Sequence, residues 1–145
     1  MARGYPDFFG TSVFSYSGPV SVQYSLVPLI LAGATKKIFG LDLKGIIYGG
    51  YFRTQTVVNV AAVSIRCDVD SNTIGLVAYA TLFAYEITAS YRGLPYFTRY
   101  DPDGELFEFG FSPGISFGNK YNITIENASA GGMLIDGALF YSQIV

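Results

Sequence analysis

Oxygen-bearing side chains at regular spacing are the clearest candidates for chemistry in this chain of 145 residues. Asp68, Asp70 and Asn72 stand at alternate positions, as the first ligands of an EF-hand calcium loop do. The match ends there, because Thr73 occupies the position that requires glycine and Tyr79 occupies that of the bidentate glutamate. We therefore interpret the segment as a turn at the end of a strand and predict no metal site.

A second acidic group surrounds the sequence Asp-Pro-Asp-Gly. Asp101, Asp103 and Glu105 could collect a cation at this point, but the same residues suit a tight turn. Proline presets φ for the first central position, and glycine supplies a positive φ. Turn chemistry and cation binding explain these residues equally well.

Catalytic side chains form no recognisable set. The chain has no His, so its Ser and Thr hydroxyls lack the commonest general base. Its single Cys, at position 67, allows no internal disulfide and no zinc cluster. We predict neither enzymatic activity nor a cofactor. Glycosidases use a pair of carboxylates, but the sequence indicates no arrangement that would pair any two of the candidates. These candidates are Glu86, Glu105, Glu108, Glu126 and Asp136.

Charged residues are few, and the acidic ones slightly outnumber the basic ones. Lys and Arg number 9 against 11 Asp and Glu, the reverse of the balance expected of an electrostatic nucleic-acid binder. Charged residues make up 14% of the chain, whereas soluble domains average about 25%. So few charges cannot cover the roughly 7,000 Å² that a monomer of this mass exposes. We therefore expect an apolar surface used for association.

A membrane protein would also be poor in charge, but the apolar runs are short. Residues 26–34 and 74–85 are the longest uncharged apolar stretches. Both fall short of the roughly 20 residues that a spanning helix needs. We expect no membrane contact.

The first 19 residues read as an extended N-terminal arm. Gly and Pro interrupt every turn that a helix would need. The arm is nevertheless rich in aromatic rings, which suit contact with its own domain or with a neighbouring subunit. We take four of these rings as candidate oligomer or lattice contacts: Phe8, Phe9, Phe14 and Tyr16.

Most of the remaining chain predicts β-strands. Residues 61–70 alternate cleanly, with Cys67 on the apolar face, and the turn at 101–104 predicts a hairpin. Residues 74–90 fit both a helical stripe and a two-residue period, and we favour a short helix or crossover there. The expected strands are residues 20–30, 35–43, 45–54, 61–70, 96–100, 105–111, 114–117, 120–127 and 133–145.

The last of these strands, residues 133–145, is apolar on both faces. Asp136, Ser142 and Gln143 are its only polar interruptions. Such a strand belongs in the centre of a sandwich or against a partner subunit. Phe140 and Tyr141 are therefore our candidate subunit contacts.

These elements predict an all-β fold. Short strands separated by turns favour an antiparallel two-sheet β-sandwich, and most specifically a jelly roll. We expect a single domain at 20–145 preceded by the arm at 1–19, since no linker separates a second domain.

The arm MARGYPDFFGTSVF and the closing GGMLIDGALFYSQIV resemble segments of virus structural proteins. The chain looks most like the small jelly-roll decoration or auxiliary proteins of tailed-phage capsids, and somewhat like phage tail-tip modules. The resemblance implies a virion protein without enzymatic activity that forms homotrimers and stabilises a capsid lattice. Its implied partners are itself and the major capsid protein or other virion proteins.

Two other functions stay open. A phage tail, baseplate or receptor-binding module would share the trimer but occupy another place in the particle. A carbohydrate-binding module would expose Tyr side chains on one sheet face, and the chain has 12 Tyr to supply them.

Overall fold

The computed structural model describes residues 19–55, 62–78, 94–101 and 106–144. The predicted arm at 1–19, with Phe8, Phe9, Phe14 and Tyr16, lies outside the described residues apart from Pro19. Among the residues that are described, no helix is long and apolar enough to cross a membrane.

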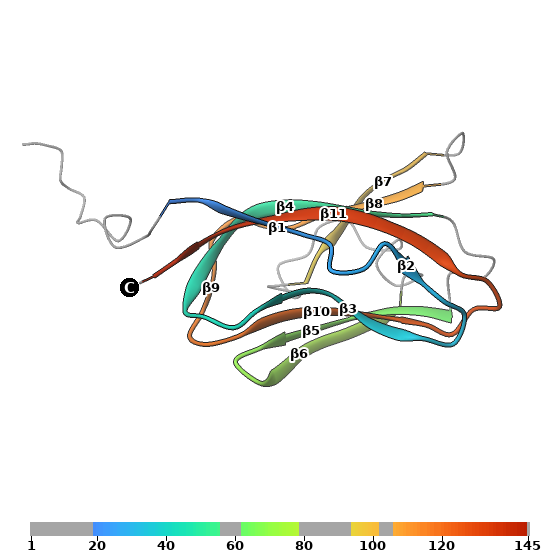
Figure 1. The fold of residues 1–145 in the computed structure, drawn as a ribbon, viewed down its shortest axis with the longest axis horizontal. Helices are drawn as coiled ribbons and strands as arrows, with labels where there is room; N and C mark the ends of the chain where they lie inside the picture. Colours follow the sequence, from blue (N-terminus) through green and yellow to red (C-terminus); the bar gives the residue numbers. More distant parts are fainter. Residues whose placement is uncertain (1–18, 56–61, 79–93, 102–105, 145) are drawn as a thin grey trace, which may run out of the picture.

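The described chain forms two antiparallel sheets that pack face to face (Figure 1). The smaller sheet has the order β3-β10-β5-β6, with β3 at Thr35–Leu41, β10 at Tyr121–Asn127, β5 at Val63–Val69 and β6 at Asn72–Ala78. The larger sheet has the order β1-β11-β4-β8-β7, with β2 beside β11 and β9 beside β4. Its strands are β1 (Ser21–Tyr24), β2 (Leu29–Ile30), β4 (Gly45–Gln55), β7 (Tyr96–Asp101), β8 (Leu106–Gly110), β9 (Ile115–Phe117) and β11 (Met133–Gln143).

This strand order is that of a jelly roll. Early and late strands alternate within each sheet, so that β1 lies beside β11 and β3 lies beside β10. Strands β4 and β5 then pair with the late strands from the other side. The prediction of an antiparallel two-sheet sandwich with jelly-roll topology is confirmed, and β7 extends the larger sheet at one edge.

Aromatic rings fill the space between the sheets. The Phe52 and Phe109 rings stack with their centroids 4.8 Å apart, while Phe39 meets Phe111 edge-on at 5.6 Å. The predicted alternation of β8 is confirmed, since Phe107, Phe109 and Phe111 are all buried. From the smaller sheet, β10 contributes buried residues at every second position: Tyr121, Ile123 and Ile125.

Two hairpins follow the turn chemistry of the sequence. Strands β7 and β8 pair antiparallel, which confirms the hairpin around residues 102–105, although these four residues lie outside the described part. Strands β5 and β6 are joined through Asp70 and Ser71, whose φ angles of 52° and 72° are both positive. Two successive positive φ angles are typical of the type I′ turn that suits a two-residue hairpin.

The prediction of a helix within residues 74–90 is wrong for residues 74–78, the part of this range that the structure describes. Residues 72–78 form strand β6, paired with β5 from Ser64 to Val69. Ile74 and Leu76 both face outward, as the period of two requires. Pairing with the free edge of β5 outweighs the weak helical preference of this segment. Residues 79–90 lie outside the described part.

The strand expected at residues 20–30 is interrupted. Residues 25–28 separate β1 from β2, and Pro28 has no N–H to contribute to a ladder. Within this break the chain turns toward the other sheet, since the Leu26 amide donates to the Ile38 carbonyl of β3 at 2.9 Å. The segment therefore links the two sheets at one edge.

The last strand lies in the middle of the larger sheet, between β1 and β4. Residues 133–136 are covered on one face only, because Met133 and Ile135 are buried while Leu134 and Asp136 are exposed. The prediction that both faces are buried is therefore wrong for this part of the strand, whereas Ala138, on the same face as Leu134, is buried.

Cys67 provides a chemical test of this packing. Its thiol is fully buried in the core, and burial raises its pKa to about 12, although a hydrogen bond with Tyr121 acts in the opposite direction. Because the thiolate is the reactive form, Cys67 should react at least about a hundredfold more slowly with a thiol reagent in the native protein than in urea. Absorbance of the released chromophore measures both rates. Equal rates would contradict the core position.

Candidate interaction surface

The face of the larger sheet that points away from the smaller sheet carries a patterned set of side chains. Successive strand residues alternate between the two faces, and directly paired residues share a face. The paired residues therefore form rows that run across the strands. We refer to this surface, on β1, β11, β4, β8 and β7, as the outer face.

The first two rows of the outer face are apolar and aromatic. Val22 pairs with Phe140, which pairs in turn with Gly49. One step along the strands, Tyr24 pairs with Ala138. The same second row continues across β4, β8 and β7 through Tyr51, Gly110 and Tyr96.

At the other end of the outer face lies a leucine pair. Leu29 of β2 is the direct partner of Leu134 of β11, and both side chains are exposed. Leu26 and Leu31 flank β2 in sequence and are also exposed. Exposed apolar side chains that gather in this way mark association surfaces more often than those scattered singly.

A row of charges crosses the outer face between the aromatic row and the leucine pair. Asp136 pairs with Arg53, Arg53 with Glu108, and Glu108 with Arg99. The signs alternate across four neighbouring strands, from negative on β11 to positive on β7. We call these four residues the charge ladder.

Two ion pairs hold the ladder in place. Arg53 donates to both carboxylate oxygens of Asp136, Nε to Oδ1 at 3.1 Å and Nη2 to Oδ2 at 2.7 Å. This hydrogen bonding raises the pKa of Arg53. Arg99 Nε donates to Glu108 Oε1 at 2.6 Å. The Arg53 guanidinium also lies 5.6 Å from the centre of the Tyr51 ring, which connects the ladder to the aromatic row.

The predicted contact residues of β11 lie on opposite sides of the sheet. Phe140 is on the outer face beside Val22, partly exposed. Tyr141 is also partly buried, but it packs against the hydrophobic core. Both residues remain predicted contacts, and of the two only Phe140 belongs to the outer face.

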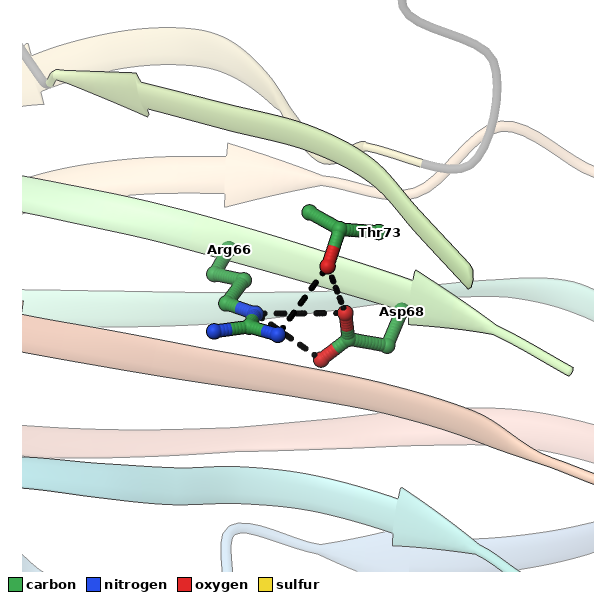
Figure 2. Close-up of polar contacts among 3 residues, drawn as sticks. All are labelled: Arg66, Asp68 and Thr73. Atoms are coloured by element: carbon green, nitrogen blue, oxygen red, sulfur yellow. Dashed lines mark hydrogen bonds and ion pairs between the residues drawn. The ribbon is translucent and has the colours of Figure 1, made fainter. Parts of the chain in front are cut away.

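The first candidate calcium ligand, Asp68, belongs to a polar cluster on the smaller sheet (Figure 2). Arg66 Nε lies 3.2 Å from each carboxylate oxygen of Asp68, and Thr73 Oγ1 donates to Asp68 Oδ1 at 2.6 Å. Arg66 Nη2 donates in turn to Thr73 Oγ1 at 3.0 Å. Arg66, two residues away on the same strand, balances the charge of Asp68, and Thr73 of β6 binds the carboxylate from the neighbouring strand.

Asp70 serves the neighbouring loop. Its carboxylate accepts hydrogen bonds from the backbone amides of Gly118, Asn119 and Lys120 at 2.7–3.1 Å. These bonds favour the charged form and lower the pKa of Asp70. Within the described ranges no group of three or more Cys, Asp or Glu residues is placed to hold a metal ion. The turn interpretation accounts for both aspartates.

The remaining candidates for catalysis are not brought together. Glu108 and Asp136 lie in the same row, but Arg53 stands between them and pairs with Asp136. Glu86 and Glu105 lie outside the described residues. Two Gly-x-Ser-x-Gly spacings are centred on Ser112 and Ser116, but Ser116 lies in strand β9, and the chain has no His to activate either hydroxyl.

Two solved structures of viral particles resemble the fold. The VP2 subviral particle of infectious bursal disease virus matches 88% of this chain and 33% of that chain, at 16% identity and a TM-score of 0.46. The cyanophage Pam1 capsid asymmetric unit matches 99% of this chain and 96% of that chain, at 11% identity and a TM-score of 0.45. No protein-family model and no curated protein sequence matches the chain. Likenesses at this level assign no family, partner or assembly.

Sequence analysis missed the charge ladder. The four residues are separated by up to 83 positions, as Arg53 and Asp136 show. The only available signal was one charged residue at an outward position of each of these four strands. Strand register, which sequence alone does not supply, is needed to align them.

Proposed function

We propose that the chain is a non-enzymatic structural protein of a virus particle. It decorates or stabilises a capsid through symmetric contacts with copies of itself, as a homotrimer, and with the major capsid protein. Nucleic acid, membrane and cofactor have no part in this function.

The observation that carries the proposal is the apolar outer face of a jelly-roll sandwich. Exposed side chains on or beside this face include Val22, Tyr24 and Leu134, with exposed fractions of 41%, 71% and 55%. Their burial at about 25 cal/mol per Å² favours association before the entropy of association is subtracted. Repeated around a ring and over a lattice, modest contacts of this kind add through avidity.

The predicted arm supplies the first test. Deleting residues 1–16 should weaken self-association or attachment to capsids by at least about tenfold, because the aromatic anchors Phe8, Phe9, Phe14 and Tyr16 are lost. The thermal midpoint of the sandwich should stay within a few degrees. Sedimentation velocity measures the first effect, and circular dichroism the second.

A variant with Ala at these four positions serves as the matched control, because it keeps the length of the arm and removes only the rings. If the deletion changes neither mass nor attachment, the arm is not a contact element. If the full chain stays monomeric at millimolar concentration and does not attach to capsids, the structural role itself is wrong.

The second candidate function is carbohydrate binding, which the tyrosines of the outer face favour. Tyr24, Tyr51 and Tyr96 belong to one row, and Tyr24 is the most exposed of the large hydrophobic side chains described. Aromatic faces of this kind stack on sugar rings. A glycan array with the full chain and with Tyr24→Ala separates this function from the structural one.

A tail or receptor-binding module differs from a decoration protein only by its place in the particle.

A further inference from the structure

The charge ladder has an order that makes it complementary to itself. From β11 to β7 the signs run negative, positive, negative, positive, in the residues Asp136, Arg53, Glu108 and Arg99. Reversed, the same row runs positive, negative, positive, negative. A second copy of this row, laid against the first in reverse, places an opposite charge across from every member.

The direction of the symmetry axis follows from this order. A two-fold axis parallel to the strands, between β4 and β8, reverses the row and sets Asp136 against Arg99 of the second copy. It also sets Arg53 against Glu108. An axis across the strands would instead set each residue against itself and oppose like charges, which destabilises a contact. The ladder therefore selects one of the two face-to-face arrangements.

The aromatic row beside the ladder fits the same arrangement. An axis along the strands keeps each row at the level of its own copy and exchanges β4 with β8 and β11 with β7. Tyr51 then lies opposite Gly110 of the second copy, and Tyr96 lies opposite Ala138, so each ring meets a small residue. Apolar contacts are thus buried beside the ladder, as in the centre of a specific interface.

The strands that overlap set the area of this contact. The axis places β8, with 5 residues, over β4, and β7, with 6 residues, over β11. At about 4.8 Å between strands and about 3.3 Å per residue, the overlap covers roughly 350 Å² on each copy. A standard interface buries roughly 800 Å² on each partner, so this is a small contact that gains strength by repetition in a lattice.

We infer that the outer face binds a second copy of this chain across a two-fold axis parallel to the strands, with Asp136 opposite Arg99 and Arg53 opposite Glu108. This inference rests on the proposed function and names one of its symmetric contacts. In a lattice, the two-fold contact joins neighbouring oligomers, whereas the trimer contact lies elsewhere on the subunit.

A charge exchange between two variants tests the inference. In a two-fold dimer of the Arg99→Glu variant, the new carboxylate at position 99 faces Asp136 of the second copy. In a dimer of the Asp136→Arg variant, the new guanidinium at position 136 faces Arg99 of the second copy. Each variant alone should dimerise roughly tenfold or more weakly than the natural chain. An equimolar mixture should recover the dimer as a heterodimer, because both opposed pairs again carry opposite charges. Native mass spectrometry identifies the heterodimer, and sedimentation equilibrium gives the dissociation constants.

Matched controls carry the same charge changes on exposed residues of the smaller sheet, Lys36→Glu and Glu126→Arg, and should leave association unchanged. Circular dichroism melting of every variant verifies that the sandwich is folded. Exposed ion pairs add little to stability, so the variants should fold.

The other outcomes separate the two proposals. If Arg99→Glu and Asp136→Arg each associate as the natural chain does, another surface makes the contact; the inference fails and the proposed function stands. If both variants weaken association but the mixture does not restore it, the two-fold pairing is wrong. If the natural chain itself never associates, with itself or with capsids, the proposed function fails as well.

Discussion

Replacing Phe52 by Ala should lower the free energy of unfolding by about 4 kcal/mol, a large part of the roughly 5–15 kcal/mol that stabilises a typical domain. The Phe52 side chain is fully buried in the centre of β4. Its ring stacks on Phe109 and also lies 6.5 Å from Phe39 and 5.9 Å from Phe111. Removing it leaves a cavity lined by rings from both sheets, which neighbouring backbone cannot fill.

Urea unfolding followed by tyrosine fluorescence measures this loss. Leu76→Ala is the control, because Leu76 is exposed at 58% on edge strand β6 and its truncation should change stability by less than about 0.5 kcal/mol. Equal effects of the two substitutions would mean that the two sheets do not pack through Phe52.

Replacing Gly137 by Ala should destabilise the fold by about 3 kcal/mol or prevent folding, through overpacking. Gly137 of β11 pairs directly with Phe52 of β4. A Cβ at this position would lie 2.5 Å from the Tyr51 carbonyl oxygen and 2.8 Å from Phe52 Cα. Both are backbone atoms of the adjacent strand, so the clash can be relieved only by moving β4 away from β11.

Gly131→Ala is the matched control for this substitution. Gly131 lies just before β11, and no atom comes within 4 Å of a Cβ added there. This variant should keep the natural thermal midpoint or exceed it slightly, since alanine reduces the entropy of the unfolded chain. The soluble yield and the thermal midpoint of both variants provide the measurement. A Gly137→Ala protein as stable as the control would contradict the pairing of β11 with β4.

Much of the sandwich was predictable from local alternation. Strands β5 and β10 present one apolar face and one polar face, and β8 carries Phe at alternate positions; the structure places these apolar side chains in the core. Strand β6 was not predictable in the same way, because its residues fit two periods. Its pairing with β5 decides between them, and that pairing is a tertiary effect.

The candidate interaction surface was predictable only in composition. The scarcity of charge pointed to an association surface, and Phe140 and Tyr141 stay predicted subunit contacts. Which charges line up depends on register. The extra residue of β4 at Tyr48, opposite the step from Phe140 to Tyr141, and that of β7 at Thr98 shift the register by one residue, and no local sequence pattern predicts them.

The place of β11 also bears on how the protein emerges from the ribosome. Residues 133–143 fill the gap between β1 and β4, strands whose residues are translated much earlier. Until that segment leaves the exit tunnel, β1 and β4 both lack the strand with which they pair in the folded protein. The larger sheet can therefore be completed only late in biosynthesis. Before then, the unpaired edges of β1 and β4 are where a chaperone would keep the chain from pairing with neighbouring chains on the same polysome.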